Sequence, residues 1–416
     1  MSATSDSAAT ESAAPVIGGG APSRDRRDRR VVAALAVTQT IGYGVLYYAF
    51  SVFLAPMARD LRASNAQIAA ALTLSVLIAA VCAPLVGRLL DAHGGRVLMT
   101  TGSVLGAAAV LAWSRVESLP QLYAVFALVG VACSMVLYEA AFAVIVSLYA
   151  GNERGRAGGL LALTVVAGFA SSIFLPLTGL LVDRHGWRTA LVILALVYGI
   201  AAIPLHALVL RRARTAGKQA SAAAQDRAAI VKAATRRRPF WLLVIAFTAN
   251  GGAAATVAVL LITYLIHLGH PPVLAATLAG LLGVLSVTGR LLTTGLQTRL
   301  PAALIAAAIF ALQGVAVLLL PLIGRSVAGA TGAVLLFGLG FGVASITLPH
   351  LLVGRYGTAA YASLAGRIAV FSVADKALAP LGAVALAQAA GYGWVMGAVA
   401  VACAVSAFAL VAYHRL

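Results

Sequence analysis

The sequence is short of charged residues and of cysteine, and each shortage excludes a class of protein. Only 10% of its 416 residues are charged, whereas 62% are hydrophobic. A soluble domain carries about 25% charged and about 45–50% apolar residues. The composition therefore excludes a water-soluble globule, and the same hydrophobicity excludes a largely disordered chain. The three cysteines (Cys82, Cys133 and Cys403) lie inside apolar runs, which excludes a disulfide scaffold.

The sequence also lacks the patterns of enzymes and of metal centres. No group of Cys and His residues has metal-site spacing. No Gly-x-x-x-x-Gly-Lys-Ser/Thr loop supports ATP binding, and no nucleophile has a matching base. We therefore expect no enzyme activity, no metal and no other cofactor.

Long apolar runs dominate what is present. A helix of about 20 apolar residues crosses a hydrocarbon core about 30 Å thick. Runs of this kind recur along the whole chain and predict an all-α membrane protein with twelve transmembrane helices. The predicted spans are 31–54, 66–90, 97–114, 120–149, 157–182, 187–210, 240–267, 273–297, 302–323, 328–353, 361–388 and 392–413.

Two polar segments divide the chain into regions. Residues 1–30 lack the apolar core of a signal peptide, so we expect a disordered cytoplasmic tail. Residues 211–239 form a strongly basic linker. The linker separates an N-terminal six-helix half, 31–210, from a C-terminal six-helix half, 240–416.

The basic residues predict how the chain sits in the membrane. The 30 Lys and Arg residues outnumber the 12 acids, for a net charge of +18. Membrane proteins collect Lys and Arg in cytoplasmic loops, and cytoplasmic termini place most of the cations on that side. The outer loops then hold only Arg59, Arg62, Arg115, Arg184, Arg188 and Arg325. We expect a multi-pass protein of the inner (plasma) membrane with both termini cytoplasmic, in contact with the lipid bilayer and with no nucleic-acid partner.

Four ionisable residues are placed deep within the spans, namely Glu139, Arg290, Asp375 and Lys376. A charge in the bilayer costs about 2.5–3.5 kcal/mol on insertion scales, so such residues usually face a cavity and have a function. These four are the first candidates for a transport site.

A glycine-rich motif joins spans two and three. Gly87 allows close helix contact, Gly94 begins a tight turn, and Asp91 is followed by Arg96 in the pattern Gly-x-x-x-Asp-x-x-Gly-x-Arg. Asp91 can pair with Arg96 or lie at a helix N-terminus, where a negative charge is stabilised. A second copy runs from Gly179 to Arg188, between spans five and six.

Twelve spans, a basic linker between two halves and this loop motif resemble the major facilitator superfamily over residues 31–413. The resemblance implies two six-helix halves that alternate access to a central site. It also implies that Gly87, Asp91, Gly94 and Arg96 latch the cytoplasmic side. In the second half the counterpart begins at Gly289 but lacks the Asp.

Within the superfamily, the chain is most similar to the bacterial monocarboxylate and oxalate/formate carriers. Span one carries the aromatic stretch Gly42–Tyr48, span eight contains Arg290, and span eleven contains Lys376 four residues before Pro380. The resemblance implies that Arg290 and Lys376 bind an organic anion. The chain departs from that branch at Asp375, which could neutralise Lys376.

Each in-span charge has a structural alternative. The guanidinium of Arg290 fits a carboxylate bidentately, but it could also pack on backbone carbonyls or snorkel. Lys376 could line the pathway or form a buried ion pair with Asp375. Glu139 and Asp375 are candidate proton carriers, because burial favours the protonated form of a carboxyl group. Alternatively, Glu139 pairs with an arginine such as Arg154 or Arg156 in the gate.

Polar side chains also line one face of span one. Gln39, Tyr43 and Tyr47 recur every four residues, which places them on one helical face. We expect this face to contact substrate. Asn250, followed by two glycines in span seven, is the matching candidate in the second half and indicates a possible helix break.

Together these features predict a monomeric secondary transporter of a small organic anion, coupled to protons or to anion exchange. The monocarboxylate class follows from the resemblance. The alternatives are an exporter of drugs, metalloids or other neutral or cationic molecules, and a transporter-like sensor.

Overall fold

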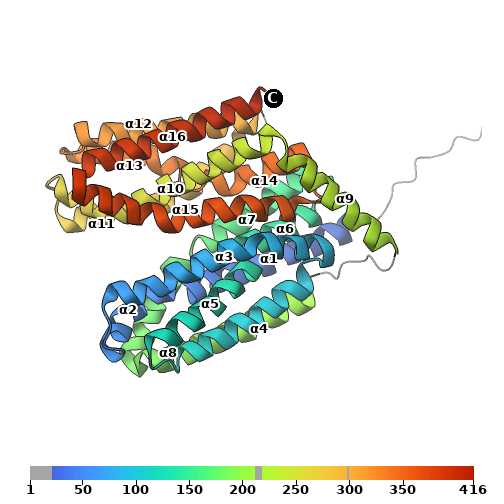
Figure 1. Ribbon diagram of the computed structural model, residues 1–416, viewed down its shortest axis with the longest axis horizontal. Helices are drawn as coiled ribbons and strands as arrows, with labels where there is room; N and C mark the ends of the chain where they lie inside the picture. Colours follow the sequence, from blue (N-terminus) through green and yellow to red (C-terminus); the bar gives the residue numbers. More distant parts are fainter. Residues whose placement is uncertain (1–20, 211–217, 298) are drawn as a thin grey trace, which may run out of the picture.

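The computed structural model describes residues 21–210, 218–297 and 299–416, and every regular element in these ranges is helical. Figure 1 shows two helical bundles lying side by side, with α9 crossing one end of the molecule. We call this the linker end, because α9 (Lys218–Thr235) belongs to the linker.

The N-terminal bundle consists of α1 (Ala21–Tyr43), the π-helical η1 (Gly44–Tyr48), α2 (Ala49–Asp60), α3 (Asn65–His93), α4 (Gly95–Trp113), α5 (Leu119–Val136), α6 (Tyr138–Leu148), α7 (Glu153–Ala167) and α8 (Ala170–Val209). The C-terminal bundle consists of α10 (Arg238–His267), α11 (Pro272–Leu296), α12 (Ala302–Ile323), α13 (Val327–Gly340), α14 (Val343–Tyr356), α15 (Tyr361–Ala390) and α16 (Tyr392–His414).

The predicted all-α architecture with twelve spans is confirmed. In the described ranges, 11 continuous stretches are long and apolar enough to cross a membrane. One of them, Glu153–Val209, has 57 residues, and at 1.5 Å per residue a helix of that length would span a bilayer more than twice. The stretch consists of α7 and α8, and Gly186, with φ 75°, divides α8 into two helices. This positive φ suits glycine because it has no Cβ.

One boundary differs from the sequence prediction. The first helix begins at Ala21, so part of the predicted tail 1–30 is helical; residues 1–20 lie outside the described ranges. The described part of the predicted linker 211–239 is mostly the helix α9.

The packing cores show where the halves meet. One core lies wholly in the N-terminal half, around Trp113 and Phe126. Another lies wholly in the C-terminal half, around Phe337. A third joins residues of both halves, including Leu90 and Tyr361 beside the α3–α4 turn. The halves therefore share a core at the linker end, while each has its own core farther away.

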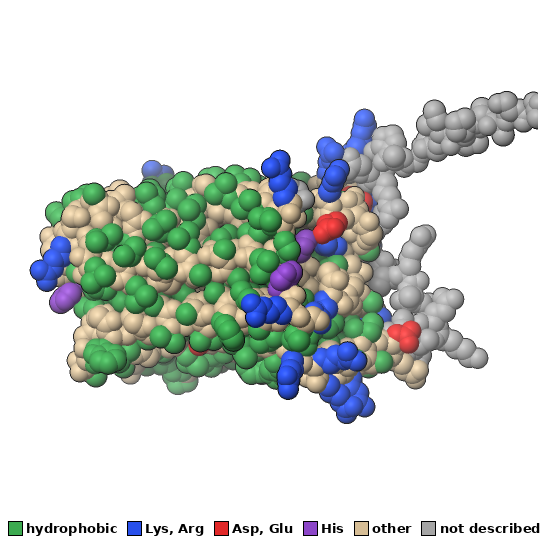
Figure 2. Space-filling view, turned by 90° about the horizontal axis from the view of Figure 1, so that it is seen from above, with side chains coloured by type: hydrophobic (Ala, Val, Ile, Leu, Met, Phe, Trp, Pro, Cys, Tyr) green, Lys and Arg blue, Asp and Glu red, His purple; other side chains and the backbone are tan. Residues whose placement is uncertain are grey.

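The outer surface suits a bilayer. Figure 2 shows hydrophobic side chains over the middle of one face and Lys and Arg side chains gathered mainly towards the linker end. Large apolar side chains stand exposed on the outer helices, such as Leu208 at 77% and Phe408 at 76%. Lipid tails are the environment in which such exposure carries no penalty.

Candidate functional site

Asp91 connects the two halves at the linker end. Its carboxylate oxygens accept hydrogen bonds from the backbone N–H groups of Ala362 (3.1 Å) and Ser363 (2.7 Å). These N–H groups belong to the first turn of α15, which carries the positive end of the helix dipole. Of the two partners considered for Asp91, the structure places it at a helix N-terminus. Gly94 turns the chain with φ 75°, and no side-chain bond of Arg96 is found in the described ranges.

Glycines allow α3 and α15 to approach closely beside this bond. A Cβ on Gly87 would collide with the carbonyl of Ala362, and a Cβ on Gly366 would collide with the carbonyl of Ala83. The crossing is therefore reciprocal, with a glycine on each helix facing backbone on the other. Gly366 was not predicted, because a single glycine in an apolar run gives no sign of its partner.

Arg290 forms a second connection between the halves. Its Nε donates to the carbonyl of Gly342 at 3.2 Å, and its Nη1 donates to the carbonyl of Thr164 at 3.1 Å. Gly342 precedes α14 in the same half, whereas Thr164 belongs to α7 in the other half. In this conformation Arg290 thus bonds backbone carbonyls, the arrangement expected of its packing alternative. It is nevertheless only part-buried, and Nη2 has no protein partner in the described ranges.

Four phenol rings cluster in the N-terminal half opposite Arg290. Tyr43 lies 4.6 Å from Tyr138 and 6.4 Å from Tyr47, between ring centroids. Tyr47 lies 5.3 Å from Tyr48. Three of the rings come from the end of α1 and from η1, and π-helical turns inside α-helices occur frequently at functional sites. Tyr47 is 40% exposed, so the cluster has an open side.

Arg290 and Glu139 both lie within electrostatic range of this cluster. Arg290 lies near Tyr43, Tyr48 and Tyr138. Glu139 lies near Tyr43 and Tyr138. A cation from one half and a carboxyl group from the other therefore share a set of phenols. Such a site offers charge to an anion, hydroxyl groups for hydrogen bonds and a group that can carry a proton.

Glu139 has no ion pair with Arg154 or Arg156 in the described ranges. The acid that connects α7 with α14 is Glu153, whose Oε1 lies 3.6 Å from Nε2 of His350. Arg156 is buried in the same contact region between the halves, where it lines a small cavity with His350. An acid therefore does lie at this contact between the halves, but it is Glu153 on α7 rather than Glu139 on α6.

Gln39 and Asn250 lie in equivalent packing positions. Gln39 is fully buried and its Nε2 donates to the carbonyl of Val136 at 2.6 Å. Asn250 donates to Oε1 of Gln313 at 2.9 Å, and Gln313 donates to the carbonyl of Phe337 at 3.0 Å. Each amide therefore ties the first helix of its half to neighbouring helices. In this conformation neither amide forms a hydrogen bond with the phenol cluster.

Asp375 and Lys376 point to different sides of α15, since consecutive helical residues are about 100° apart. The carboxylate of Asp375 lies where a side chain on Gly252 would collide with it, and Lys376 packs its stem near Gly251. The helix α10 runs unbroken through these glycines, so they make room for side chains rather than mark a break. No ion pair joins Asp375 to Lys376 in the described ranges.

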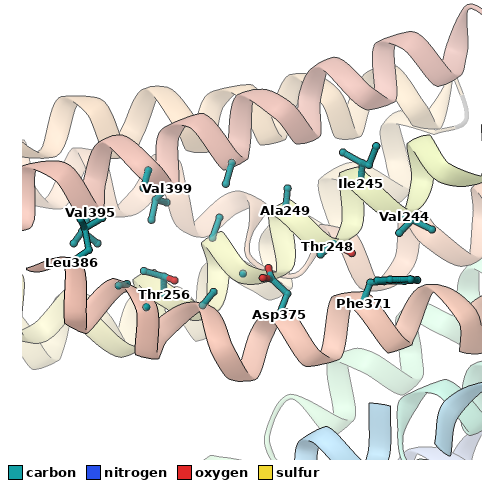
Figure 3. Close-up of a pocket in the computed structure, with 17 residues that line it drawn as sticks. Val244, Ile245, Thr248, Ala249, Thr256, Phe371, Asp375, Leu386, Val395 and Val399 are labelled. Atoms are coloured by element: carbon teal, nitrogen blue, oxygen red, sulfur yellow. The ribbon is translucent and has the colours of Figure 1, made fainter. Parts of the chain in front are cut away.

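Asp375 faces a groove between α10, α15 and α16 rather than the phenol cluster. Figure 3 shows its carboxylate pointing towards α10, among side chains that are mostly apolar. The groove encloses about 540 Å³. Ile245 and Phe371, which also line it, are each 45% exposed on the outer surface. The groove therefore opens towards the region where lipid lies.

Sequence reasoning missed parts of this arrangement. Tyr138 directly precedes Glu139, and a polar pair within an apolar span was a usable signal. Thr164, Ala362 and Ser363 contribute backbone atoms, and no side-chain pattern can reveal such a contribution.

Comparisons with known proteins agree with this architecture. Residues 36–374 match the family described as the Major Facilitator Superfamily. The human organic anion transporter MFSD10 (TETRAN) has a similar structure, with a TM-score of 0.69 and 16% identity, over 92% of this chain and 99% of that one. A variant of the E. coli fucose:proton symporter FucP has a TM-score of 0.69 and 15% identity, over 92% and 98%. At these identities the likeness concerns the fold. No curated protein sequence matches the chain significantly.

Proposed function

Because the chain belongs to the Major Facilitator Superfamily of membrane transporters, we propose that it moves a small organic anion, a monocarboxylate, across the inner (plasma) membrane by alternating access. The observation that carries this proposal is the position of Arg290. Its guanidinium reaches from α11 to the carbonyl of Thr164 in the other half, beside a cluster of phenols. A cation at the junction of the halves can both bind an anion and affect how the halves fit together.

The proposed binding step is an exchange of hydrogen-bond partners. In this conformation Arg290 donates to the neutral carbonyls of Gly342 and Thr164. A carboxylate offers charge-assisted, bidentate bonds, which are roughly twice as strong as those to neutral acceptors. When Nη1 turns to the carboxylate, the bond to Thr164 is lost and the halves are released from one contact. Substrate binding thereby favours the movement that transports it.

The remaining predicted residues take supporting parts in this proposal. Tyr43 and Tyr47 offer hydroxyl groups to the substrate, and Lys376 supplies a second positive charge. Gln39 and Asn250 act indirectly, because they fix α1 and α10 to their neighbours. We assign the proton to Glu139, since it shares the phenol cluster with Arg290. One proton moving with one carboxylate makes the cycle electroneutral.

We further propose that the linker end is cytoplasmic and that this conformation is closed there. Gly87, Asp91, Gly94 and Arg96 belong to the latch, in which Asp91 holds the first turn of α15. Most Lys and Arg residues then lie on the cytoplasmic side, as the positive-inside rule requires.

A binding experiment tests the proposal. Purified protein is heated with a panel of small monocarboxylates, dicarboxylates and neutral sugars at pH 5.5 and at pH 7.5. A ligand that binds only the folded state raises the unfolding temperature in proportion to the logarithm of its concentration. We expect stabilisation by a monocarboxylate, and a larger effect at the lower pH. Stabilisation by sugars or by none of the carboxylates would contradict the proposal.

The second candidate function is export of an apolar cation, and the groove around Asp375 favours it. A single carboxylate among apolar side chains is suited to a hydrophobic ammonium group. Resistance to such compounds on overexpression, abolished by Asp375→Asn and unaffected by Arg290→Ala, would select this alternative.

A further inference from the structure

A second cavity lies at the linker end of the C-terminal half, away from the phenol cluster. It encloses about 570 Å³ between the start of α10 and the end of α16. Its polar wall consists of Arg236, Arg237, Arg238 and Arg415. These residues come from two segments far apart in the sequence, which the fold brings to one place.

The four guanidinium groups of this cavity have no protein partner among the described residues. None of them makes a side-chain hydrogen bond or an ion pair in the described ranges, and no Asp or Glu lines the wall. Leu416 also lines the cavity, and its main-chain oxygen accepts a bond from the nearby Arg355 at 3.3 Å. The four arginines are exposed, so their guanidinium groups are accessible to an anionic group at the membrane surface.

The opposite wall of the cavity is apolar and continues towards the membrane interior. Leu242, Ile245, Phe408 and Val411 form it, and Phe408 is 76% exposed. Trp241 also lines the cavity, 45% exposed, with its indole nitrogen donating to the carbonyl of Thr235 at 2.9 Å. A tryptophan half in contact with polar groups and half with apolar ones is typical of the membrane interface.

The apolar wall leads into the groove described above. Ile245 lines both the arginine cavity and the groove that contains Asp375, and Figure 3 shows it on α10 at the edge of that groove. A continuous apolar track therefore runs from the arginines towards the middle of the bundle. A free phosphate or another small soluble anion would leave this track uncovered.

We propose that this cavity binds an anionic phospholipid. The phosphate headgroup lies among Arg236, Arg237, Arg238 and Arg415, and one acyl chain follows α10 past Ile245. Basic pockets between membrane helices at the cytoplasmic side are suited to headgroups with more than one phosphate. Guanidinium groups bind phosphate bidentately, and the apolar wall gives the acyl chain a surface to pack against in the hydrocarbon region. The bound lipid braces the start of α10, where the linker joins the second half.

The experiment measures lipid binding to the purified full chain. Delipidated protein in a neutral detergent is titrated with cardiolipin, with phosphatidylcholine and with inorganic phosphate, and the unfolding temperature and the lipid adducts in native mass spectrometry are recorded. We expect cardiolipin to raise the unfolding temperature and to remain bound. Phosphatidylcholine and inorganic phosphate should do neither. An equal effect of inorganic phosphate would overturn the proposal in favour of a soluble anion site.

A charge-matched pair of variants locates the site. Arg238→Gln combined with Arg415→Gln removes two arginines of the cavity. Lys232→Gln combined with Arg299→Gln removes two cations elsewhere at the linker end. Each charged hydrogen bond lost costs about 1.5–3 kcal/mol, so the first variant should bind cardiolipin at least roughly tenfold more weakly. Equal weakening in both variants would show a non-specific charge effect and overturn the proposal.

A third variant keeps the test valid if the double arginine variant folds poorly. Phe408→Ser leaves all charges in place and shortens the apolar wall. We expect it to weaken binding of cardiolipin with long acyl chains more than that of a short-chain analogue. If Phe408→Ser binds the long-chain lipid as tightly as the wild type does, and likewise the short-chain lipid, the proposed path of the acyl chain is contradicted.

Discussion

At the scale of single residues, Asp91 and Asp183 offer an internal comparison. Both occupy the acidic position of the same motif. Asp91 accepts two backbone bonds from the other half, whereas Asp183 is exposed and has no such bond in the described ranges. The motif alone therefore does not identify a latch. The latch is identified by the position of the first copy of the motif, next to the first turn of α15.

We predict that Asp91→Asn weakens closure of the linker end and that Asp183→Asn does not. The amide keeps one acceptor oxygen but loses the charge that favours the helix N-terminus, a change of about 1–2 kcal/mol. Spin labels at His93 and Gly354, introduced in a cysteine-free background, report the distance between the halves. Asp91→Asn should broaden the distribution of this distance and extend it to longer values. An equal shift in Asp183→Asn would contradict the assignment.

The two acids within the spans, Glu139 and Asp375, lie in different parts of the molecule, and this gives a second prediction. Glu139→Gln should abolish uptake driven by a proton gradient while preserving exchange of substrate across the membrane, because exchange needs no net proton movement. Asp375→Asn, in the groove that faces lipid, should retain proton-driven uptake. The measurement is uptake into proteoliposomes with and without a pH gradient. The reverse result would assign the proton to Asp375.

At the scale of elements, hydropathy predicts most of the architecture. Each predicted span coincides with a helical segment of the structure, because a bilayer demands about 20 apolar residues in a row. Hydropathy does not predict the π-helical η1, since it is a local change of backbone geometry within apolar sequence. The break at Gly186 falls in the polar segment between the predicted spans 157–182 and 187–210, so hydropathy did predict it. Hydropathy also does not predict how deeply a polar side chain is buried. Gln39 shares a helical face with Tyr43, yet lies where the helices are tightly packed.

Glycine positions give a test of helix contact. Gly87 faces the carbonyl of Ala362, whereas Gly179 has no atom within 4 Å of where a Cβ would be. We predict that Gly87→Ala lowers the unfolding temperature and reduces transport, because α3 and α15 can no longer approach. Gly179→Ala should leave transport unchanged and stabilise the helix by up to about 1 kcal/mol. Similar behaviour of the two variants would show that the crossing is not restricted by Gly87.

At the scale of the whole molecule, the shared core at the linker end and the separate cores beyond it describe a transporter closed at one end. Substrate binding should open this end and close the other. Spin labels at Arg115 and Arg325, both in exposed turns of the far end, should approach each other when the pair at His93 and Gly354 separates. Distances that change at only one end would contradict a rocking motion of two halves.

The sequence predicted the fold at this scale. It also predicted which charged residues lie within the spans, but not the groups that they contact. Arg290 was identified because a charge within a span is costly and therefore conspicuous. Its bonds to Thr164 and Gly342 depend on how two separate bundles meet, which no local pattern encodes. The same holds for the positions that Asp375 and Lys376 occupy beside Gly252 and Gly251 of α10.

The most direct test of the central claim is counterflow of a radiolabelled monocarboxylate in proteoliposomes that contain Arg290→Ala. Arg325→Ala, which removes an exposed cation at the far end, serves as the control, and equal incorporation is verified for both. We predict that the wild type and Arg325→Ala exchange the substrate identified by thermal stabilisation, and that Arg290→Ala does not. Exchange by Arg290→Ala at the wild-type rate would contradict an anion site at Arg290.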